Sequence, residues 1–133
     1  MTVELRPVGV VESTLSDPAS APKQGTEDGP PAWLRFRPEF ADAIRDLDVG
    51  DDVFVLTWLH LADRSALTVH PRDDPANPLT GVFSTRSADR PNPIGLHRVR
   101  VVAIDGTRVR VADLEAVDGT PVLDVKPVLD ATR

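Results

Sequence analysis

Apolar and polar residues alternate along much of the chain, a pattern that predicts β-strands. The segments with this pattern are residues 8–13, 33–37, 52–60, 67–70, 99–104 and 108–112, and a last strand carries Asp124 and Lys126. Residues 33–37 turn Leu34 and Phe36 to one side. Residues 52–60 are apolar on both faces and should form a central strand that is buried on two sides. The fold class is therefore expected to be mainly β.

One short helix is predicted directly after the second strand. Pro38 suits the first position of a helix, and Phe40, Ile44 and Leu47 follow at spacings that place them on one helical face. Gly50 ends this pattern. We expect a short amphipathic helix that packs against the sheet.

Residues 99–104 and 108–112 should form a hairpin, because Asp105 and Gly106 between them are a strong turn signal. A strict two-residue turn would mix charged and apolar residues on each face. A three-residue connection, or a bulge, instead pairs Val101 with Val111 and Ala103 with Val109. This register sends four arginines to the other face, which we call the arginine stripe: Arg98, Arg100, Arg108 and Arg110. The stripe is either a basic contact surface or an ordinary solvated strand face.

The sequence predicts a stiff, irregular loop at residues 81–96. Pro91 and Pro93 fix the backbone, and Gly95 gives it a conformation that other residues resist. The loop carries hydroxyls and three longer polar side chains: Arg86, Arg90 and Asn92. Guanidiniums beside hydroxyls suit a carboxylate or a phosphate. The alternative is a rigid turn with its arginines in solvent.

Three further features have both a functional and a structural interpretation. The long polar segment at residues 15–31 contains Pro22-Lys23-Gln24-Gly25, and loops of this length are either disordered or part of a binding site. His60, at a strand end, is either a hydrogen-bonded structural residue or part of a ligand site. Asp124 and Lys126 point to the same face and form either a surface ion pair or part of a pocket wall.

Composition narrows the functional classes. A chain of 133 residues with 41% hydrophobic residues is expected to form one domain. It has no cysteine, and no apolar run of membrane-spanning length, so we expect a cytoplasmic protein. The three histidines lack close acidic or histidine neighbours in the sequence, so no metal site is expected. The net charge of −6 argues against a nucleic-acid partner, although the distribution of charge matters more than its sum.

Five segments together resemble the TrmO (YaeB-like) family of tRNA methyltransferases. They are PKQG at 22–25, WLH at 58–60, GVFSTRS at 81–87, RPNPIGL at 90–96 and DGTPVLDVKP at 118–127. The resemblance implies a β-barrel-like domain that binds S-adenosylmethionine near a homodimer interface. It also implies methylation of N6 on threonylcarbamoylated adenosine beside the tRNA anticodon. Consistently, no Gly-x-Gly-x-x-Gly turn of the Rossmann type occurs in the chain.

The resemblance also implies the site residues. The cofactor contacts would be Lys23, Gln24, Gly25, His60, Leu61, Arg86, Leu96, Ala112, Asp113, Leu114 and Glu115. The substrate contacts would be Arg90, Asn92, Lys126 and the arginine stripe. A general base could take the proton of the weakly nucleophilic N6, and Asp118, Asp124 and His60 are the candidates.

The chain also departs from the family pattern. It stops shortly after Lys126, so residues 1–133 are expected to be one domain without the C-terminal extension of longer members. Val128 replaces a common aromatic residue, and His97 and Arg98 are unusual. Two alternatives therefore remain: a methyltransferase of the same fold that acts on a small molecule or another RNA, and a non-catalytic S-adenosylmethionine-binding module.

Overall fold

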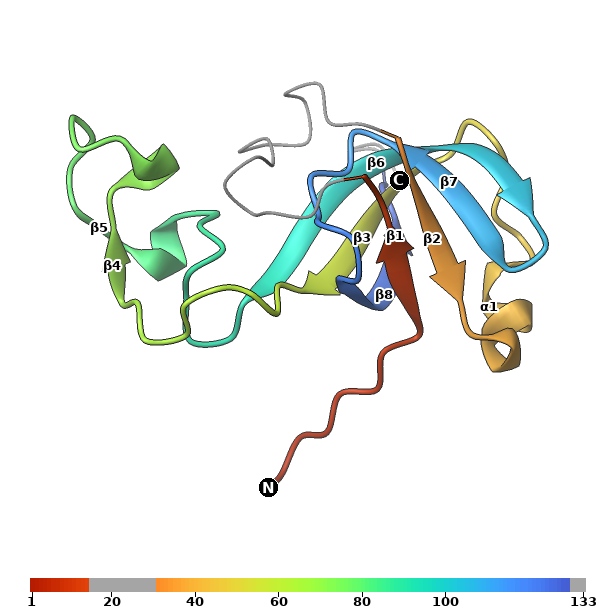
Figure 1. The fold of residues 1–133 in the computed structure, drawn as a ribbon, viewed down its shortest axis with the longest axis horizontal. Coiled ribbons are helices and arrows are strands. Elements are labelled where there is room, and N and C mark those ends of the chain that lie inside the picture. Colours follow the sequence, from red (N-terminus) through yellow and green to blue (C-terminus); the bar gives the residue numbers. More distant parts are fainter. Residues whose placement is uncertain (15–30, 130–133) are drawn as a thin grey trace.

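The structure, a computed structural model, describes residues 1–14 and 31–129. Six antiparallel strands close into a barrel in the order β1-β2-β7-β6-β3-β8 (Figure 1). Their bounds are β1 Gly9–Glu12, β2 Ala32–Phe36, β3 Asp52–Trp58, β6 Ile94–Asp105, β7 Arg108–Ala112 and β8 Pro121–Pro127. The mainly β, barrel-like fold class is confirmed.

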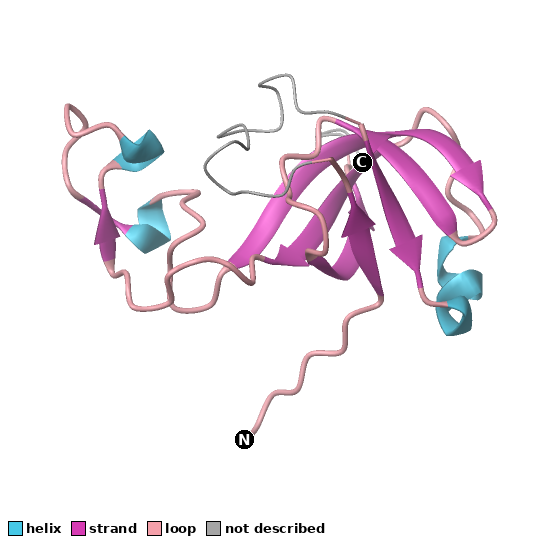
Figure 2. Cartoon of the chain, in the orientation of Figure 1, coloured by secondary structure: helices cyan, strands magenta, loops and turns pink. Residues whose placement is uncertain are grey.

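An arm, residues 59–93, leaves the barrel between β3 and β6. It holds a two-stranded sheet of β4 (Thr68–Val69) and β5 (Thr80–Gly81), together with the short helical turns η3 (Pro71–Asp73) and η4 (Val82–Ser84). Figures 1 and 2 show the arm extending to one side of the barrel. The strand predicted at residues 67–70 is present as β4.

The predicted helix is present but short. It consists of the turn η2 (Pro38–Phe40) and α1 (Ala41–Ile44), with Pro38 at the start. Ile44 is buried in the barrel core, Leu47 is half-buried against that core, and Phe40 is half-buried. Among the described residues, no helix has the length and apolar character needed to cross a membrane.

The barrel interior follows the alternation of the strands. Inward residues form one apolar core with members such as Val11, Leu34, Val55, Val101 and Val122. The prediction that residues 52–60 are buried on both faces is wrong. Burial alternates along β3, and its outward side chains stay only half-buried, because a strand of a barrel turns just one face to the interior.

The hairpin register is partly as predicted. Val101 pairs with Val111, but a bulge follows at once, so that Ala103 pairs with Arg110 and Ile104 with Val109. The predicted pair of Ala103 with Val109 is therefore wrong. The bulge, rather than a longer turn, restores the face that the valines need, and Gly106 (φ +59°) lies in the tight turn. β6 also begins earlier than expected, at Ile94.

Three connections meet at one end of the barrel, which we call the arm end. Because neighbouring strands are antiparallel, β1 ends, β3 ends and β7 ends there, and β2, β6 and β8 begin there. The connections at this end are the arm, the segment 113–120, and a segment that includes residues 15–30, which lie outside the described residues. The helical segment and the β6–β7 turn lie at the opposite end.

Gly9 generates a prediction about barrel closure, because it pairs with both Phe36 of β2 and Val122 of β8. A Cβ at this position would lie 2.6 Å from the backbone oxygen of Arg35. Gly9→Ala should therefore destabilise the protein by about 1–3 kcal/mol in urea unfolding.

Gly81→Ala is the matched control, since a Cβ there meets no atom within 4 Å and the backbone is extended. It should change stability by less than about 0.5 kcal/mol. Equal effects of the two substitutions would contradict the close packing at Gly9.

Candidate functional site

The arm end brings together several residues that the sequence resemblance had assigned to the cofactor. His60 and Leu61 follow the end of β3, and Leu96 lies near the start of β6. Glu115 lies in the segment 113–120 and contacts His97, the neighbour of Leu96. Residues from three separate stretches of the chain thus share one end of the barrel. Lys23, Gln24 and Gly25 lie outside the described residues.

A buried hydrogen-bonded chain crosses the interior at this end. His97 of β6 points inward and is 4% exposed. Its Nε2 lies 2.7 Å from the Thr57 hydroxyl of β3, and its Nδ1 lies 3.0 Å from Oε1 of Glu115. Gly95 makes room for this pair, because a Cβ there would lie 2.4 Å from the Thr57 hydroxyl.

Glu115 is held by this chain on one side only. Its other carboxylate oxygen, Oε2, is buried and has no hydrogen-bond partner among the described residues. A buried acceptor without a donor costs about 1–3 kcal/mol, so the arrangement is unfavourable unless a ligand supplies the donor. This orphaned oxygen makes the arm end a candidate binding site.

The segment 113–120 is fixed by its neighbours on both sides of Glu115. Leu114 and Ala116 are buried in the barrel core, and Asp113 bends the backbone at φ +68°. The Thr120 hydroxyl donates to the Val117 carbonyl inside the protein. Glu115 therefore projects from a segment whose backbone is fixed on both sides of it.

Asp118 also lies at the arm end. Its carboxylate accepts a hydrogen bond from the Ser13 backbone N–H at 3.0 Å, and Gly119 donates to the Val11 carbonyl. His60 is exposed at the same end of the barrel. Two of the three candidate bases are thus on the side of the molecule that carries Glu115.

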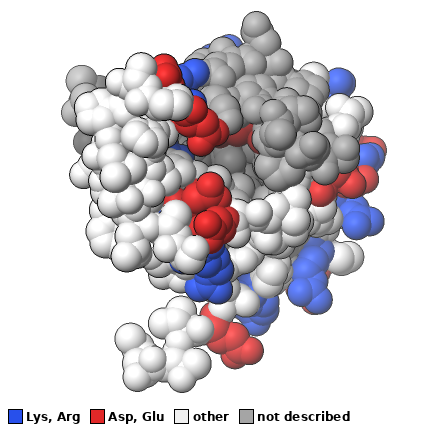
Figure 3. Space-filling view, turned by 60° about the vertical axis from the view of Figure 1, so that its left-hand side comes forward, with Lys and Arg blue, Asp and Glu red and all other residues white. Residues whose placement is uncertain are grey.

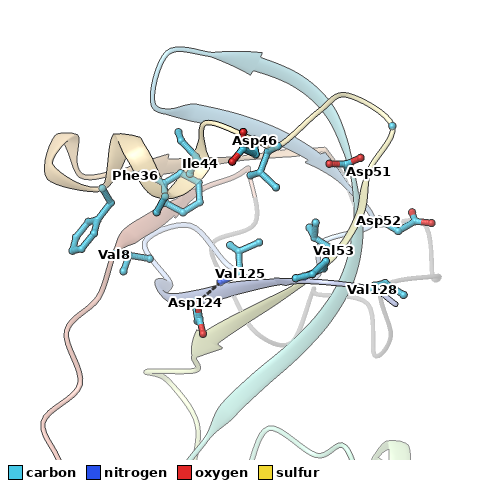
Figure 4. Close-up of a pocket in the computed structure, with 15 residues that line it drawn as sticks. Val8, Phe36, Ile44, Asp46, Asp51, Asp52, Val53, Asp124, Val125 and Val128 are labelled. Atoms are coloured by element: carbon cyan, nitrogen blue, oxygen red, sulfur yellow. Dashed lines mark hydrogen bonds between the residues drawn. The ribbon is translucent and has the colours of Figure 1, made fainter. Parts of the chain in front are cut away.

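The third candidate base, Asp124, faces elsewhere. It is exposed on the outer side of β8 and forms an ion pair with Lys126 at 3.8 Å. It borders a cavity of about 600 Å³ between the helical segment and β8. Figure 4 shows that cavity, with Phe36, Ile44, Val53 and Val125 around it and aspartates nearby. Apart from Asp124, none of the predicted site residues lines it.

The base of the arm is tied together by Arg64, which sequence reasoning missed. Its guanidinium donates to the Pro91 carbonyl at 2.8 Å and to the Asn92 side-chain oxygen at 3.0 Å. It also lies 5.0 Å from the centre of the Trp58 ring. Asn92, a predicted substrate contact, is therefore held by Arg64, which stacks on the last residue of β3.

Arg90 holds the stiff loop itself. Its guanidinium donates to three backbone carbonyls of the loop, those of Val82, Thr85 and Ser87. Several of the donors expected to face an anion are thus used within the loop. Arg86, by contrast, is exposed. Of the two loop guanidiniums, Arg86 is the more accessible one.

The Asp63 carboxylate also belongs to the arm base. It accepts hydrogen bonds from the Ser65 hydroxyl and backbone N–H, and these bonds lower the pKa of Asp63 below its usual value. Its own N–H donates to Asp89. Figure 3 shows this side of the molecule, where acidic side chains border a hollow.

The arginine stripe lies on the outer barrel surface, as the register predicted, but much of its charge is paired. Arg98 and Arg100 both contact Asp52, at 3.9 and 3.3 Å. Arg108 contacts Glu12 at 3.3 Å and stacks 4.4 Å from the Trp33 ring centre. Arg110 is exposed. The stripe is a mixed surface rather than a purely basic one.

His97 and Thr57 could have been found from the sequence. In the predicted register His97 has the same parity as Val99 and Val101, and so points into the barrel. The signal was missed because the stiff loop was taken to extend to residue 96 and the strand to begin only at Val99, whereas β6 begins at Ile94. Arg64 gave no such signal, because its partners come from distant parts of the chain.

Comparison with known proteins gives consistent matches over most of the chain. The sequence model described as tRNA-methyltransferase O N-terminal domain matches residues 10–132. A "Probable S-adenosyl-L-methionine-binding protein" of Methanothermobacter thermautotrophicus is 43% identical over 96% of this chain and 90% of its own length. An "S-adenosyl-L-methionine-binding protein" of Archaeoglobus fulgidus is 37% identical over 92% of this chain and 86% of its own length.

Solved structures agree. The crystal structure of TrmO from Pseudomonas aeruginosa superposes with a TM-score of 0.76 at 30% identity, over 97% of this chain and 55% of that one. A second TrmO crystal structure gives a TM-score of 0.77 and is covered to 58%. The chain therefore spans somewhat more than half the length of these structures.

Proposed function

The chain belongs to the TrmO family, and on that basis we propose that it is an S-adenosylmethionine-dependent methyltransferase that acts on tRNA. The proposed methyl acceptor is N6 of threonylcarbamoylated adenosine beside the anticodon. The observation that carries the proposal is the match of the family model to residues 10–132, which includes all three connections of the arm end.

The arm end fits the cofactor in its chemistry. S-adenosylmethionine offers a carboxylate, which suits the exposed Arg86 guanidinium, and an adenine, which suits apolar contacts such as Leu61 and Leu96. Its hydrogen-bond donors suit the orphaned Oε2 of Glu115. The acidic side chains on one edge of the hollow in Figure 3 favour a cationic sulfonium. The bound group would supply the electrophilic methyl carbon.

The protein's own contribution would be mainly positioning, which contributes up to ~7–11 kcal/mol in well-oriented reactions. We propose Asp118 or His60 as the general base that removes the N6 proton, because both lie at the arm end. Asp124 is set aside as the base, because it is paired with Lys126 on the outer side of β8.

The direct test is incubation with methyl-labelled S-adenosylmethionine and total tRNA from the source organism, followed by nucleoside analysis. We expect label in the N6-methyl group of threonylcarbamoylated adenosine. Cofactor binding without label in any tRNA nucleoside would reject the tRNA reaction. A lack of cofactor binding would reject the whole assignment.

Arg86→Ala should weaken S-adenosylmethionine binding roughly tenfold to a hundredfold in calorimetry, because a guanidinium paired with a carboxylate makes strong charge-assisted hydrogen bonds. Arg45→Ala is the control. It removes an exposed arginine at the opposite end of the barrel and should leave the affinity unchanged. Unchanged affinity in Arg86→Ala would remove this residue from the site.

A methyltransferase that acts on a small molecule is the second candidate, and the ion pairs of the arginine stripe favour it. Asp52 and Glu12 neutralise part of the charge that an RNA backbone would meet. The net charge of −6 also favours a small-molecule acceptor over tRNA. An RNA nevertheless meets the local potential within a Debye length of ~8–10 Å, so the exposed Arg100 and Arg110 can still contact phosphates.

The double reversal Arg100→Glu with Arg110→Glu separates the two candidates. If the stripe binds RNA backbone, tRNA affinity should fall and its logarithmic salt slope should decrease by about 2, with S-adenosylmethionine affinity unchanged. Arg37→Glu with Arg45→Glu makes the same change of net charge at the other end of the barrel and should have little effect. Equal tRNA affinity in both double variants would favour the small-molecule acceptor.

We also propose that the protein is a homodimer, because large apolar side chains are exposed on the arm and the outer face of β6. Phe83 is 87% exposed, and Leu61, Leu67, Ile94 and Leu96 are exposed as well. Light scattering should give twice the chain mass of 14.4 kDa. Phe83→Glu should shift the protein towards monomer, whereas Val49→Glu, at the opposite end, should not. A wild-type mass of one chain at all concentrations would reject the dimer.

A further inference from the structure

The hydrogen bonds from Thr57 through His97 to Glu115 have one direction when Glu115 is ionised and the His97 ring is neutral. An ionised Glu115 oxygen can only accept, so Nδ1 of His97 carries the proton that faces Oε1. Nε2 of the neutral ring is then an acceptor, and the Thr57 hydroxyl donates to it. Each contact in the chain is satisfied, and the chain ends at the one oxygen that is not.

The position of this oxygen is set by the protein rather than by solvent. The Glu115 side chain is 19% exposed and that of His97 is 3% exposed. Leu114 and Ala116 anchor the backbone on either side of Glu115. Gly95, which lacks a Cβ, leaves the space that Thr57 and His97 occupy. Burial, the flanking core residues and the space at Gly95 therefore hold a single carboxylate oxygen in one place before any ligand arrives.

The number of free acceptors indicates which donor this oxygen meets. Among the buried side-chain atoms of the described residues, only Glu115 Oε2 lacks a partner. An ammonium group has three N–H donors, and this oxygen would satisfy only one of them among the buried side chains of the described residues. A ribose hydroxyl has one O–H donor and carries no charge, so one acceptor is sufficient.

We propose that Thr57 and His97 are positioning residues that hold Glu115 so that its Oε2 accepts a hydrogen bond from a ribose hydroxyl of the cofactor. This inference rests on the proposed function, because it takes S-adenosylmethionine to be the ligand of the arm end. It goes further in naming the part of the ligand that the buried chain recognises. Neither Thr57 nor His97 touches the ligand in this arrangement.

The test compares S-adenosylhomocysteine with its 2′,3′-dideoxy analogue by calorimetry. Loss of the hydroxyls should weaken binding to the wild-type protein roughly tenfold to a hundredfold. In His97→Gln, whose amide reaches towards Thr57 but not towards Glu115, that penalty should fall to less than about threefold. His97→Asn keeps a donor near the position of Nδ1 and should restore most of the penalty. His70→Gln, a change of the same kind on the arm, should leave it at the wild-type value.

A second measurement uses only the wild-type protein and so does not depend on the folding of a variant. Nitrogen-15 spectra of the histidine side chains should show His97 with its proton on Nδ1. The Nδ1 resonance should shift on addition of S-adenosylhomocysteine and not on addition of the dideoxy analogue.

The outcomes distinguish a failure of the proposed function from a failure of the positioning role. If the wild-type protein binds neither ligand, the proposed function falls and this inference falls with it. If the wild-type protein binds both ligands equally, or if the hydroxyl penalty is the same in His97→Gln as in the wild type, the positioning role is overturned while the proposed function stands.

Discussion

Closure of six antiparallel strands into a barrel is the constraint on which the rest of this structure depends. In such a ring alternate connections must lie at the same end. The connections after β1, β3 and β7 are therefore gathered at one end, although they are far apart in the sequence. The arm and the segment that carries Glu115 meet there for a topological reason, at the end of the barrel where β1 stops and β2 begins. The barrel topology alone is therefore enough to bring together the segments that could form a ligand site at this end.

The apolar interior gives the polar groups at the arm end their significance. Most inward positions are valine or leucine, so a histidine, a threonine and a glutamate among them lose their hydration and must find partners. Four of their five polar side-chain atoms do so, but Glu115 Oε2 has no partner among the described residues. A protein that keeps an unsatisfied buried oxygen on a rigid segment gives up stability, and functional sites are where such losses are expected.

The sequence predicted the fold better than it predicted the site. Strand positions follow from alternation, which reports burial directly, and Val101 opposite Val111 followed from the need to keep valines on one face. Burial of residues 52–60 on both sides was wrong, because apolar residues on the outer face of a barrel strand give the same pattern as a fully covered strand. The bulge after Val101 was not located, because alternation fixes the face of a residue but not the place where the register shifts.

The side-chain contacts within the site were harder to predict from the sequence than the strands. Arg64 joins the side chains of Asn92 and Trp58, and Glu115 reaches His97 from a different connection. Such pairs depend on three-dimensional closure, and no local pattern encodes them. His97 was the exception, since its parity with Val99 already placed it inside the barrel.

The central claim is that the arm end is the cofactor site, and a map of amide chemical-shift changes on addition of S-adenosylmethionine tests it most directly. The account predicts that the largest changes fall at residues 60–64, 86, 95–97 and 113–118. The cavity beside the helical segment is the competing site, lined by residues such as Ile44, Val53 and Val125. Changes concentrated on those residues, with the arm end unaffected, would contradict the account.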